Sequence, residues 1–289
     1  LQATFSGRVQ AAGNLESFQP KDIIAEARGR LQVAGGNIEI QQAQLNAGRW
    51  QANINTTGIE LNRFAQLPNN LPATFSGQVQ ATGNLESFQP KDITAEARGN
   101  LNIAGGSVQI QQAQLNEGRW QTAFEANNLQ LHRLTTLPNR LPATFSGQVQ
   151  AAGNLESFQA KDIQAEARGS LNIAGGSVQI QQAQLNEGRW QTTFAANNLQ
   201  LHRLATLPNR LPATFSGQVQ ATGNVTSFQP RDIAAIASGQ LNIAGGNIQI
   251  QQARLEQGRW QAAVANVSGI ELSRINNQLR GELNGENLQ

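Results

Sequence analysis

One unit of about 70 residues occurs four times in this chain, and this repetition constrains the fold more than any other feature. The motif Leu-Gln/Pro-Ala-Thr-Phe-Ser-Gly begins at Leu1, Leu71, Leu141 and Leu211. The second and third copies differ at only seven positions. Such self-similarity is typical of proteins in which each repeat packs mainly against its neighbours.

The motif divides the chain into repeats and a remnant. We define repeat 1 as residues 1–70, repeat 2 as 71–140, repeat 3 as 141–210, repeat 4 as 211–278, and 279–289 as the start of a truncated repeat 5. The remnant is assigned because Leu283 and Gly285 keep the spacing of Phe215 and Gly217. The sequence begins at Leu1 without Met or a signal-like segment, so we expect an excised part of a longer protein.

Composition excludes several classes of protein. The chain has no Cys, which excludes disulfide frameworks and thiolate metal sites. Lys+Arg 21 and Asp+Glu 19 are interspersed rather than gathered on a basic face, so we expect no nucleic-acid partner. No apolar run approaches the roughly 18 residues of a transmembrane helix, so we expect no membrane span in these residues.

Repeat 3 illustrates the local pattern, which alternates apolar and polar residues with a period of two. The pattern predicts strands over 144–154, 163–173, 178–185, 190–196 and 199–201. A turn at 155–158 separates the first two strands, and a proline-containing loop from Leu204 to Pro212 follows the last. Gly175-Gly176 predicts a tight hairpin turn. The phase slips by one residue at Gln181-Gln182, which requires a bulge or a bend. No window keeps a period of 3.6, so we expect almost no helix.

These features predict an all-β fold. Five short strands are too few for a separate sandwich, so the repeats are expected to join edge to edge into one elongated, curled antiparallel sheet. Alternation places Gln, Asn, Thr, Ser and the scattered charges on one face and Ala, Val, Ile, Leu and Phe on the other. From the residues alone, an open apolar groove and an ordinary closed core are equally compatible with this pattern.

The apolar face is the strongest candidate binding surface. Its expected lining residues are Phe5, Val9, Ile23, Leu31, Val33, Ile38, Ile40, Phe75, Val79, Ile93, Leu101, Ile103, Val108, Ile110, Phe145, Val149, Ile163, Leu171, Ile173, Val178, Ile180, Phe215, Val219, Ile233, Leu241, Ile243, Ile248 and Ile250.

The order of motifs within a repeat resembles the TamB family, especially its cyanobacterial members and their chloroplast inner-envelope relatives. In repeat 3 the resemblance rests on Leu141 to Leu155, Ala167 to Ile180, Ala183 to Trp190 and Leu199 to Leu204, and it covers essentially the whole chain. It implies a β-taco fold, a bridge-like lipid-transfer protein of the AsmA-like group, and phospholipid acyl chains in an apolar groove. It also implies an inner-membrane anchor outside these residues and a location in the periplasm or in the intermembrane space of a plastid envelope.

Two other functions remain open at this point. The same resemblance implies a chaperone or scaffold in outer-membrane protein assembly with a TamA or Omp85-type partner, which the groove or the sheet edge would serve by strand addition. The other alternative is a structural β-solenoid filament with stacked Gln and Asn ladders.

Residue types that could carry chemistry have simpler explanations here. His132 and His202 occupy a repeat position that holds Asn62 and Ser273 elsewhere, which favours a surface polar role. Neither a nucleophile with its base nor a metal ligand set is recognisable, so we expect no enzyme activity, no cofactor and no metal.

Three repeated positions are interpreted as structural. The tryptophans Trp50, Trp120, Trp190 and Trp260 are expected to anchor packing near a bend, with lipid or membrane contact as the alternative. The arginines Arg49, Arg119, Arg189 and Arg259 are expected to be solvated, with Glu117, Glu187 or residues of neighbouring repeats as alternative ion-pair partners. The aspartates Asp22, Asp92, Asp162 and Asp232 are expected to form turns through their own backbone, with a repeated cation site as the alternative.

Overall fold

The computed structural model describes residues 2–14, 19–64, 66–87, 89–135, 137, 141–157, 159–204, 211–227 and 229–288. The chain divides into two compact units: unit 1 holds residues 1–129 and 148–162, and unit 2 holds residues 130–147 and 163–289. Phe158 of the predicted turn and residues 205–210 of the predicted proline-containing loop lie outside the described residues.

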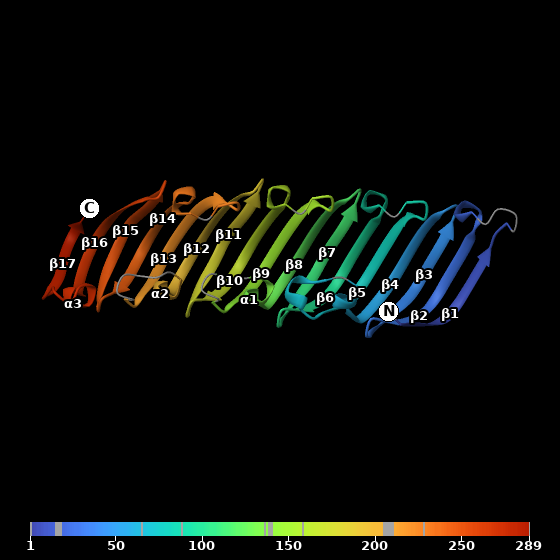
Figure 1. The fold of residues 1–289 in the computed structure, drawn as a ribbon, viewed down its shortest axis with the longest axis horizontal. Helices are drawn as coiled ribbons and strands as arrows, with labels where there is room; N and C mark the ends of the chain where they lie inside the picture. Colours follow the sequence, from blue (N-terminus) through green and yellow to red (C-terminus); the bar gives the residue numbers. More distant parts are fainter. Residues whose placement is uncertain are drawn as a thin grey trace. The chain divides into compact units, whose positions relative to one another are not determined.

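Unit 1 is built from antiparallel strands that pair in sequence order (Figure 1). They are β1 (Ala3–Ala12), β2 (Ile24–Val33), β3 (Gly36–Asn46), β4 (Arg49–Glu60), β5 (Ala73–Asn84), β6 (Thr94–Ile103), β7 (Gly106–Asn116) and β8 (Arg119–Gln130). Strand β9 (Ala143–Asn154) has residues in both units.

Unit 2 follows the same plan. Its strands are β10 (Gln164–Ile173), β11 (Gly176–Asn186), β12 (Arg189–Gln200), β13 (Ala213–Asn224), β14 (Ala234–Ile243), β15 (Gly246–Glu256), β16 (Arg259–Glu271) and β17 (Glu282–Leu288). The predicted all-β fold with a repetitive antiparallel sheet is therefore confirmed.

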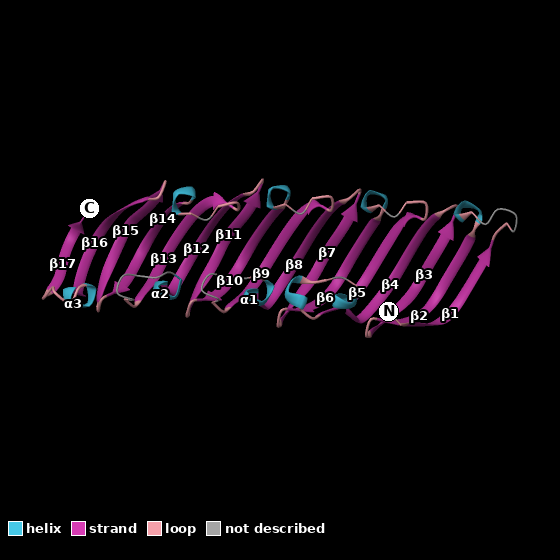
Figure 2. Ribbon diagram, viewed as in Figure 1, coloured by secondary structure: helices cyan, strands magenta, loops and turns pink. Residues whose placement is uncertain are grey.

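Among the described residues, helix is confined to single turns between strands, as predicted (Figure 2). The described turns are η1 (Pro20–Asp22), η2 (Leu61–Arg63), η3 (Pro68–Asn70), η4 (Pro90–Asp92), α1 (Leu131–Leu134), η6 (Ala160–Asp162), α2 (Leu201–Leu204), η8 (Pro230–Asp232) and α3 (Leu272–Ile275). Within the described part of the chain, no helix has the length and apolar character needed to cross a bilayer.

The described residues of each repeat form four strands, not the five that the sequence predicted. In repeat 3 the segment predicted over 190–196 and the first two residues of the segment predicted over 199–201 belong to one strand, β12, whereas Leu201 begins the helical turn α2. Its register against β13 shifts between Ala196 and Leu199, and Asn198 in this interval has a φ of 51°. The change of phase is therefore taken up by a bulge inside a continuous strand rather than by a turn.

The predicted phase slip at Gln181-Gln182 is confirmed as a bulge, because the register of β11 against β12 shifts between Ile180 and Gln182. The predicted hairpin turn is displaced by one residue. Ala174 and Gly175, with φ values of 53° and 74°, occupy its two central positions, and Gly176 already pairs with Ile173. Two central residues with positive φ are what a type I′ turn requires.

Each unit is a single layer of strands. Strands pack against their neighbours in sequence, and the other substantial contacts are made by helical turns, namely η2 with β5, α2 with β13, and η8 with β15. Along β2 every second residue from Ala25 to Val33 is half-buried and the intervening residues are exposed. This is the alternation expected of a sheet with one apolar and one polar face.

The most completely buried residues lie at one end of the strands. In unit 2 the cluster comprises Leu141, Ala174, Val178, Ala196, Leu199 and Phe215, with Leu201 and Leu204 of the helical turn packed against it. The segment that precedes β13 adds a second cluster through Leu211, which packs with Ala244, Val267 and Ile270. The well-buried core is therefore restricted to this end of the strands, where the turns between repeats complete it.

The repeated Phe-Ser-Gly motif has a structural explanation. Gly77 of β5 lies directly opposite Gly99 of β6, and a β-carbon on Gly77 would lie 2.7 Å from the Gly99 Cα and 2.9 Å from Cζ of Phe75. In repeat 1 the phenyl ring of Phe5 lies over both glycines of the equivalent pair, because β-carbons on Gly7 and Gly29 would lie 2.8 and 3.0 Å from its atoms. An aromatic ring that covers cross-strand glycine restores packing that glycine lacks.

Candidate functional site

The candidate site is the apolar face of each unit, and the registers bring its predicted residues together. Opposite partners on this face include Phe5 with Leu31 and Leu31 with Ile38 in unit 1. In unit 2, Leu171 lies opposite Val178 in the same way. The rows thus continue from strand to strand within a unit.

The predicted lining residues differ in burial. Phe5 and Val9 are exposed, at 42% and 60%. Phe75, Val108, Phe145, Val178 and Phe215 are buried. The others are half-buried: Ile23, Leu31, Val33, Ile38, Ile40, Val79, Ile93, Leu101, Ile103, Ile110, Val149, Ile163, Leu171, Ile173, Ile180, Val219, Ile233, Leu241, Ile243, Ile248 and Ile250. Most of the face therefore keeps part of its apolar surface in contact with solvent.

A strip of small side chains crosses this face, which sequence reasoning did not identify. Ala27, Ala43, Ala52, Ala81 and Ala95 are successive cross-strand partners from β2 to β6. We call this set the alanine strip. Each residue fits the period of two, but only the register reveals that the five methyl groups form one row.

Larger side chains border the alanine strip on both sides. Ile40, Ile54 and Val79 form the row on one side. Leu45 and Trp50 lie opposite each other on the other side. Because an alanine side chain ends at Cβ, the alanine strip rises less far above the sheet than the larger side chains that border it. It therefore leaves space between these two borders. The bordering positions carry no charge, which suits a hydrocarbon ligand.

The opposite face carries ladders of polar side chains. In repeat 1, Gln44 Nε2 donates to Glu26 Oε1 at 3.0 Å, and Gln51 Nε2 donates to Gln44 Oε1 at 2.7 Å. The same pairs of residue types recur in repeats 2 and 3. In repeat 4, Ile236 replaces the glutamate and Arg254 replaces the first glutamine, so its polar face lacks this ladder. These repeated glutamines thus pair across strands on the solvated face.

Three of the four tryptophans pack between repeats. Trp50 lies opposite Gly83 and Trp190 opposite Gly223, and a β-carbon on these glycines would approach the indole rings to 2.8 and 2.6 Å. Trp120 packs against Gly153 in the same way. These contacts support the predicted packing role. Trp260 differs, because its side chain is 80% exposed.

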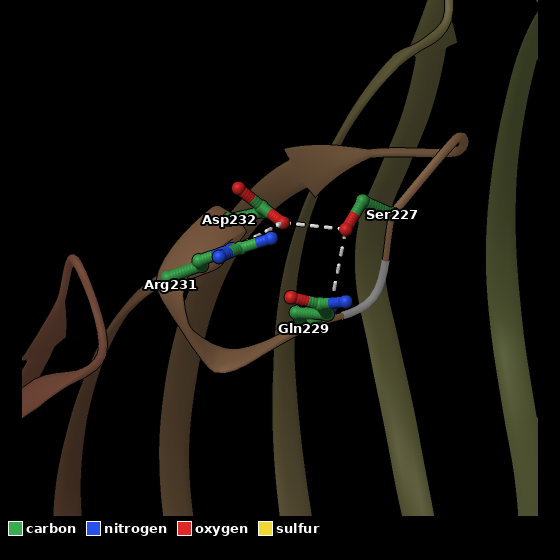
Figure 3. A network of polar contacts seen from close by, with 4 residues as sticks. All are labelled: Ser227, Gln229, Arg231 and Asp232. Carbon is green, nitrogen blue, oxygen red and sulfur yellow. Dashed lines mark hydrogen bonds and ion pairs between the residues drawn. The ribbon is translucent and has the colours of Figure 1, made fainter.

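The repeated aspartates close the turn that follows the first strand of a repeat, as Figure 3 shows for repeat 4. Ser227 Oγ donates to Asp232 Oδ2 at 2.5 Å, and the Gln229 N–H donates to Ser227 Oγ at 3.5 Å. Arg231 Nε lies 3.8 Å from the same carboxylate oxygen. The predicted turn role fits this geometry. The Asp232 carboxylate, however, accepts its hydrogen bond from a serine hydroxyl rather than from its own backbone.

Two of the equivalent aspartates make the same contact. Asp92 and Asp162 accept hydrogen bonds from Ser87 and Ser157. In the part of the chain that the structure describes, no cluster of three or more His, Asp or Glu side chains could hold a metal ion. The polar groups of the turn are directed toward one another.

The two histidines contact the backbone of the following strand. Nδ1 of His202 accepts from the Ala213 N–H at 3.3 Å, and Nδ1 of His132 accepts from the Ala143 N–H at the same distance. Their position thus serves to hold the start of a strand. The predicted surface role is too simple for His202, which is half-buried.

The repeated arginines are exposed, as predicted. The ion pairs found among the described residues join Arg63 to Glu60, Arg231 to Asp232, and Arg274 to Glu271. The suggested pairing of Arg119 with Glu117 and of Arg189 with Glu187 is therefore absent from the described structure.

No known protein family, curated protein or solved structure matches this chain. The site must therefore be interpreted from its own chemistry. It offers apolar surface, small side chains along a strip and no charge, and this combination can hold hydrocarbon without directional contacts.

Proposed function

We propose that the apolar faces bind phospholipid acyl chains and that the protein conducts phospholipids across the periplasm, between inner and outer membranes. In a plastid the corresponding space would lie between the envelope membranes. The observation that carries the proposal is the half-buried state of most apolar side chains in a single-layered unit. The resemblance to the TamB family agrees with this function and is itself part of the proposal.

The energetics favour movement over tight capture. Burial of each CH₂ group contributes about 0.8 kcal/mol, wherever along an apolar row it lies. Rows that repeat with each copy offer similar free energies at successive positions, so an acyl chain meets small barriers between them. The absence of charge on the face leaves the phospholipid head group in water, where it keeps its hydration.

The proposal is tested by photo-crosslinking from a position that tolerates an aromatic probe. Phe194 is half-buried and lies on the apolar face opposite Val219, so p-benzoylphenylalanine replaces it conservatively. Gln191, exposed on the other face of the same strand, is the matched control. We expect phospholipid adducts from position 194 and few from position 191 after expression in a double-membraned bacterium. Equal labelling at both positions would contradict the proposal.

A second function would use the same apolar face. A chaperone or scaffold for outer-membrane proteins, with an Omp85-type partner, would hold an extended apolar segment of polypeptide against the half-buried side chains. In the same experiment it predicts polypeptide adducts instead of phospholipid adducts at position 194.

The β-solenoid filament has less support. Its stacked rungs require parallel pairing between successive turns of the chain. The described strands instead pair with their sequence neighbours in antiparallel register. We therefore do not propose it.

A further inference from the structure

Strand β14 of repeat 4 differs from its counterparts on the polar face alone. It differs from β6 at four of ten positions, and from β10 at the same four, which are positions 234, 236, 238 and 240. All four side chains are exposed on the polar face, whereas the alternate residues that form the apolar face are identical in the three strands. The polar face of this strand has therefore changed while its apolar face has been kept.

The changes replace a satisfied polar pair with an apolar residue and a cation. In repeat 2, Gln114 Nε2 donates to Glu96 Oε1 at 2.8 Å across β6 and β7. At the corresponding register of repeat 4, Ile236 lies opposite Arg254. Ile236 is 42% exposed. Among the described residues, no hydrogen bond or ion pair involves the Arg254 side chain. The two residues thus present apolar surface and a positive charge side by side.

These residues line a cavity of about 380 Å³ on the polar face of unit 2. Ile236 and the small Ala234 supply its apolar part. From β13, Gln220 lies opposite Ile236 and Thr222 opposite Ala234, which adds an amide and a hydroxyl to the lining. The volume is near the lower end of the range for ligand pockets, about 300–1,000 Å³, so it suits one or two inserted side chains.

The charges around the cavity favour an acidic group at Arg254. Glu256 also lines the cavity, two residues from Arg254 on the same strand, and it lies opposite Arg259 of β16. Arg254 instead lies between uncharged neighbours, Ile236 on β14 and Gln261 on β16. A carboxylate is therefore attracted most strongly at Arg254, where the planar guanidinium can bind it through two hydrogen bonds.

We propose that this cavity docks a segment of a partner protein in which an acidic side chain lies close to Leu, Ile or Val. The carboxylate binds Arg254, and the aliphatic side chain packs on Ile236 and Ala234. Opposed residues of an antiparallel pair have Cα atoms about 4.5–5.5 Å apart, so one short segment can reach both. The site is independent of lipid binding, because it lies on the opposite face of the sheet.

A membrane surface fits this cavity less well. Recognition of anionic lipid head groups uses clusters of several basic side chains. The cavity instead presents one arginine beside Glu256 and an apolar contact. A protein segment can match the charge and the apolar surface together.

The proposal is tested with a phage-displayed library of random peptides, selected on the immobilised 289-residue chain. We expect the enriched peptides to share an acidic residue close to an aliphatic one. Isothermal titration calorimetry with synthetic copies then measures their affinities. Replacement of the acidic residue by its amide should weaken binding by about tenfold or more, because a hydrogen bond to a charged group contributes at least that much.

The double variant I236E/R254Q removes the site without endangering the fold, because repeats 2 and 3 carry this pair at the same register. We expect it to bind the enriched peptides at least about tenfold more weakly than the native chain. Q249A is the matched control, exposed on the same strand but outside the cavity, and it should bind as the native chain does. Enriched peptides that lack the acidic–aliphatic pair, or that bind I236E/R254Q as tightly as the native chain, would overturn the proposal.

The converse exchange transfers the site to unit 1. Gln80 and Thr82 lie opposite positions 96 and 94, as Gln220 and Thr222 lie opposite positions 236 and 234. The transfer variant combines T94A, E96I, Q114R and N116E. We expect calorimetry to show two bound peptides per chain instead of one. A stoichiometry that stays at one would overturn the assignment of the site to these four positions.

Vesicles of phosphatidylglycerol and phosphatidylcholine test the membrane alternative. If no peptide is enriched, and the native chain sediments with these vesicles while I236E/R254Q does not, the cavity binds lipid head groups and the proposal is overturned. Absence of both peptide binding and vesicle binding would overturn it as well.

Discussion

The indole ring of Trp190 occupies the space that a side chain on Gly223 would need. The two residues lie opposite each other on β12 and β13, and a β-carbon on Gly223 would lie 2.6 Å from Cζ2 of Trp190. One belongs to the last strand of repeat 3 and the other to the first strand of repeat 4. The contact therefore joins adjacent repeats, and it recurs as Trp50 with Gly83 and Trp120 with Gly153.

Substitution of this glycine should loosen the junction. We expect G223A to lower the free energy of unfolding by about 1–3 kcal/mol, the usual cost of overpacking, since the added methyl group meets a ring held by its own strand. Urea unfolding followed by circular dichroism measures the change. G13A is the matched control, because Gly13 occupies the same repeat position and the nearest atom to its β-carbon is 3.4 Å away. Equal losses in the two variants would show that the tryptophan is not the cause.

The second hairpin of repeat 3 can be stabilised at its turn. Glu187 has a φ of 50° and precedes Gly188 at 74°, so the pair occupies the central positions of a type I′ turn. Asn tolerates this conformation better than Glu does, so E187N should raise the free energy of unfolding by about 0.5–1 kcal/mol. E187V places a β-branched residue at the same φ and should lower it. Differential scanning calorimetry of the two variants should show melting temperatures shifted in opposite directions.

The Ser227–Asp232 hydrogen bond should show a measurable coupling energy. Both side chains belong to one turn, and the Asp232 carboxylate also lies 3.8 Å from Arg231 Nε. Because the aspartate is 37% exposed, solvent weakens the interaction, and we expect a coupling of about 0.5–1.5 kcal/mol. A double-mutant cycle of S227A and D232A, measured by urea unfolding, isolates this pair. Additive losses would show that the hydroxyl does not stabilise the carboxylate.

The openness of the apolar face can be tested with alanines in two environments. Ala221 is half-buried on β13, whereas Ala213 at the start of the same strand is 1% exposed. We expect A221L to change the free energy of unfolding by less than about 0.5 kcal/mol, and A213L to lower it by about 1–3 kcal/mol through overpacking. A large loss in both variants would indicate a closed core over the whole face.

The sequence predicted the repeats, the strands and the two faces because a period of two acts locally. It predicted the bulge at Gln181-Gln182 for the same reason, since an apolar set that changes phase must be realigned. It failed at the last strand of each repeat. Asn197-Asn198 interrupts the alternation as a turn would, and only the continued pairing of β12 with β13 shows that the strand goes on.

For the candidate site, the period of two alone identified the apolar side chains, whereas their grouping required the structure. That Phe5 and Phe75 share a face follows from alternation, but their difference in exposure depends on which strand lies alongside. The alanine strip and the Trp–Gly contacts depend on register, which joins residues about 10 to 35 positions apart. The sequence by itself thus determined what each strand presents, and the tertiary structure decided what each residue meets, because cross-strand pairing is fixed by turns and bulges rather than by local preference.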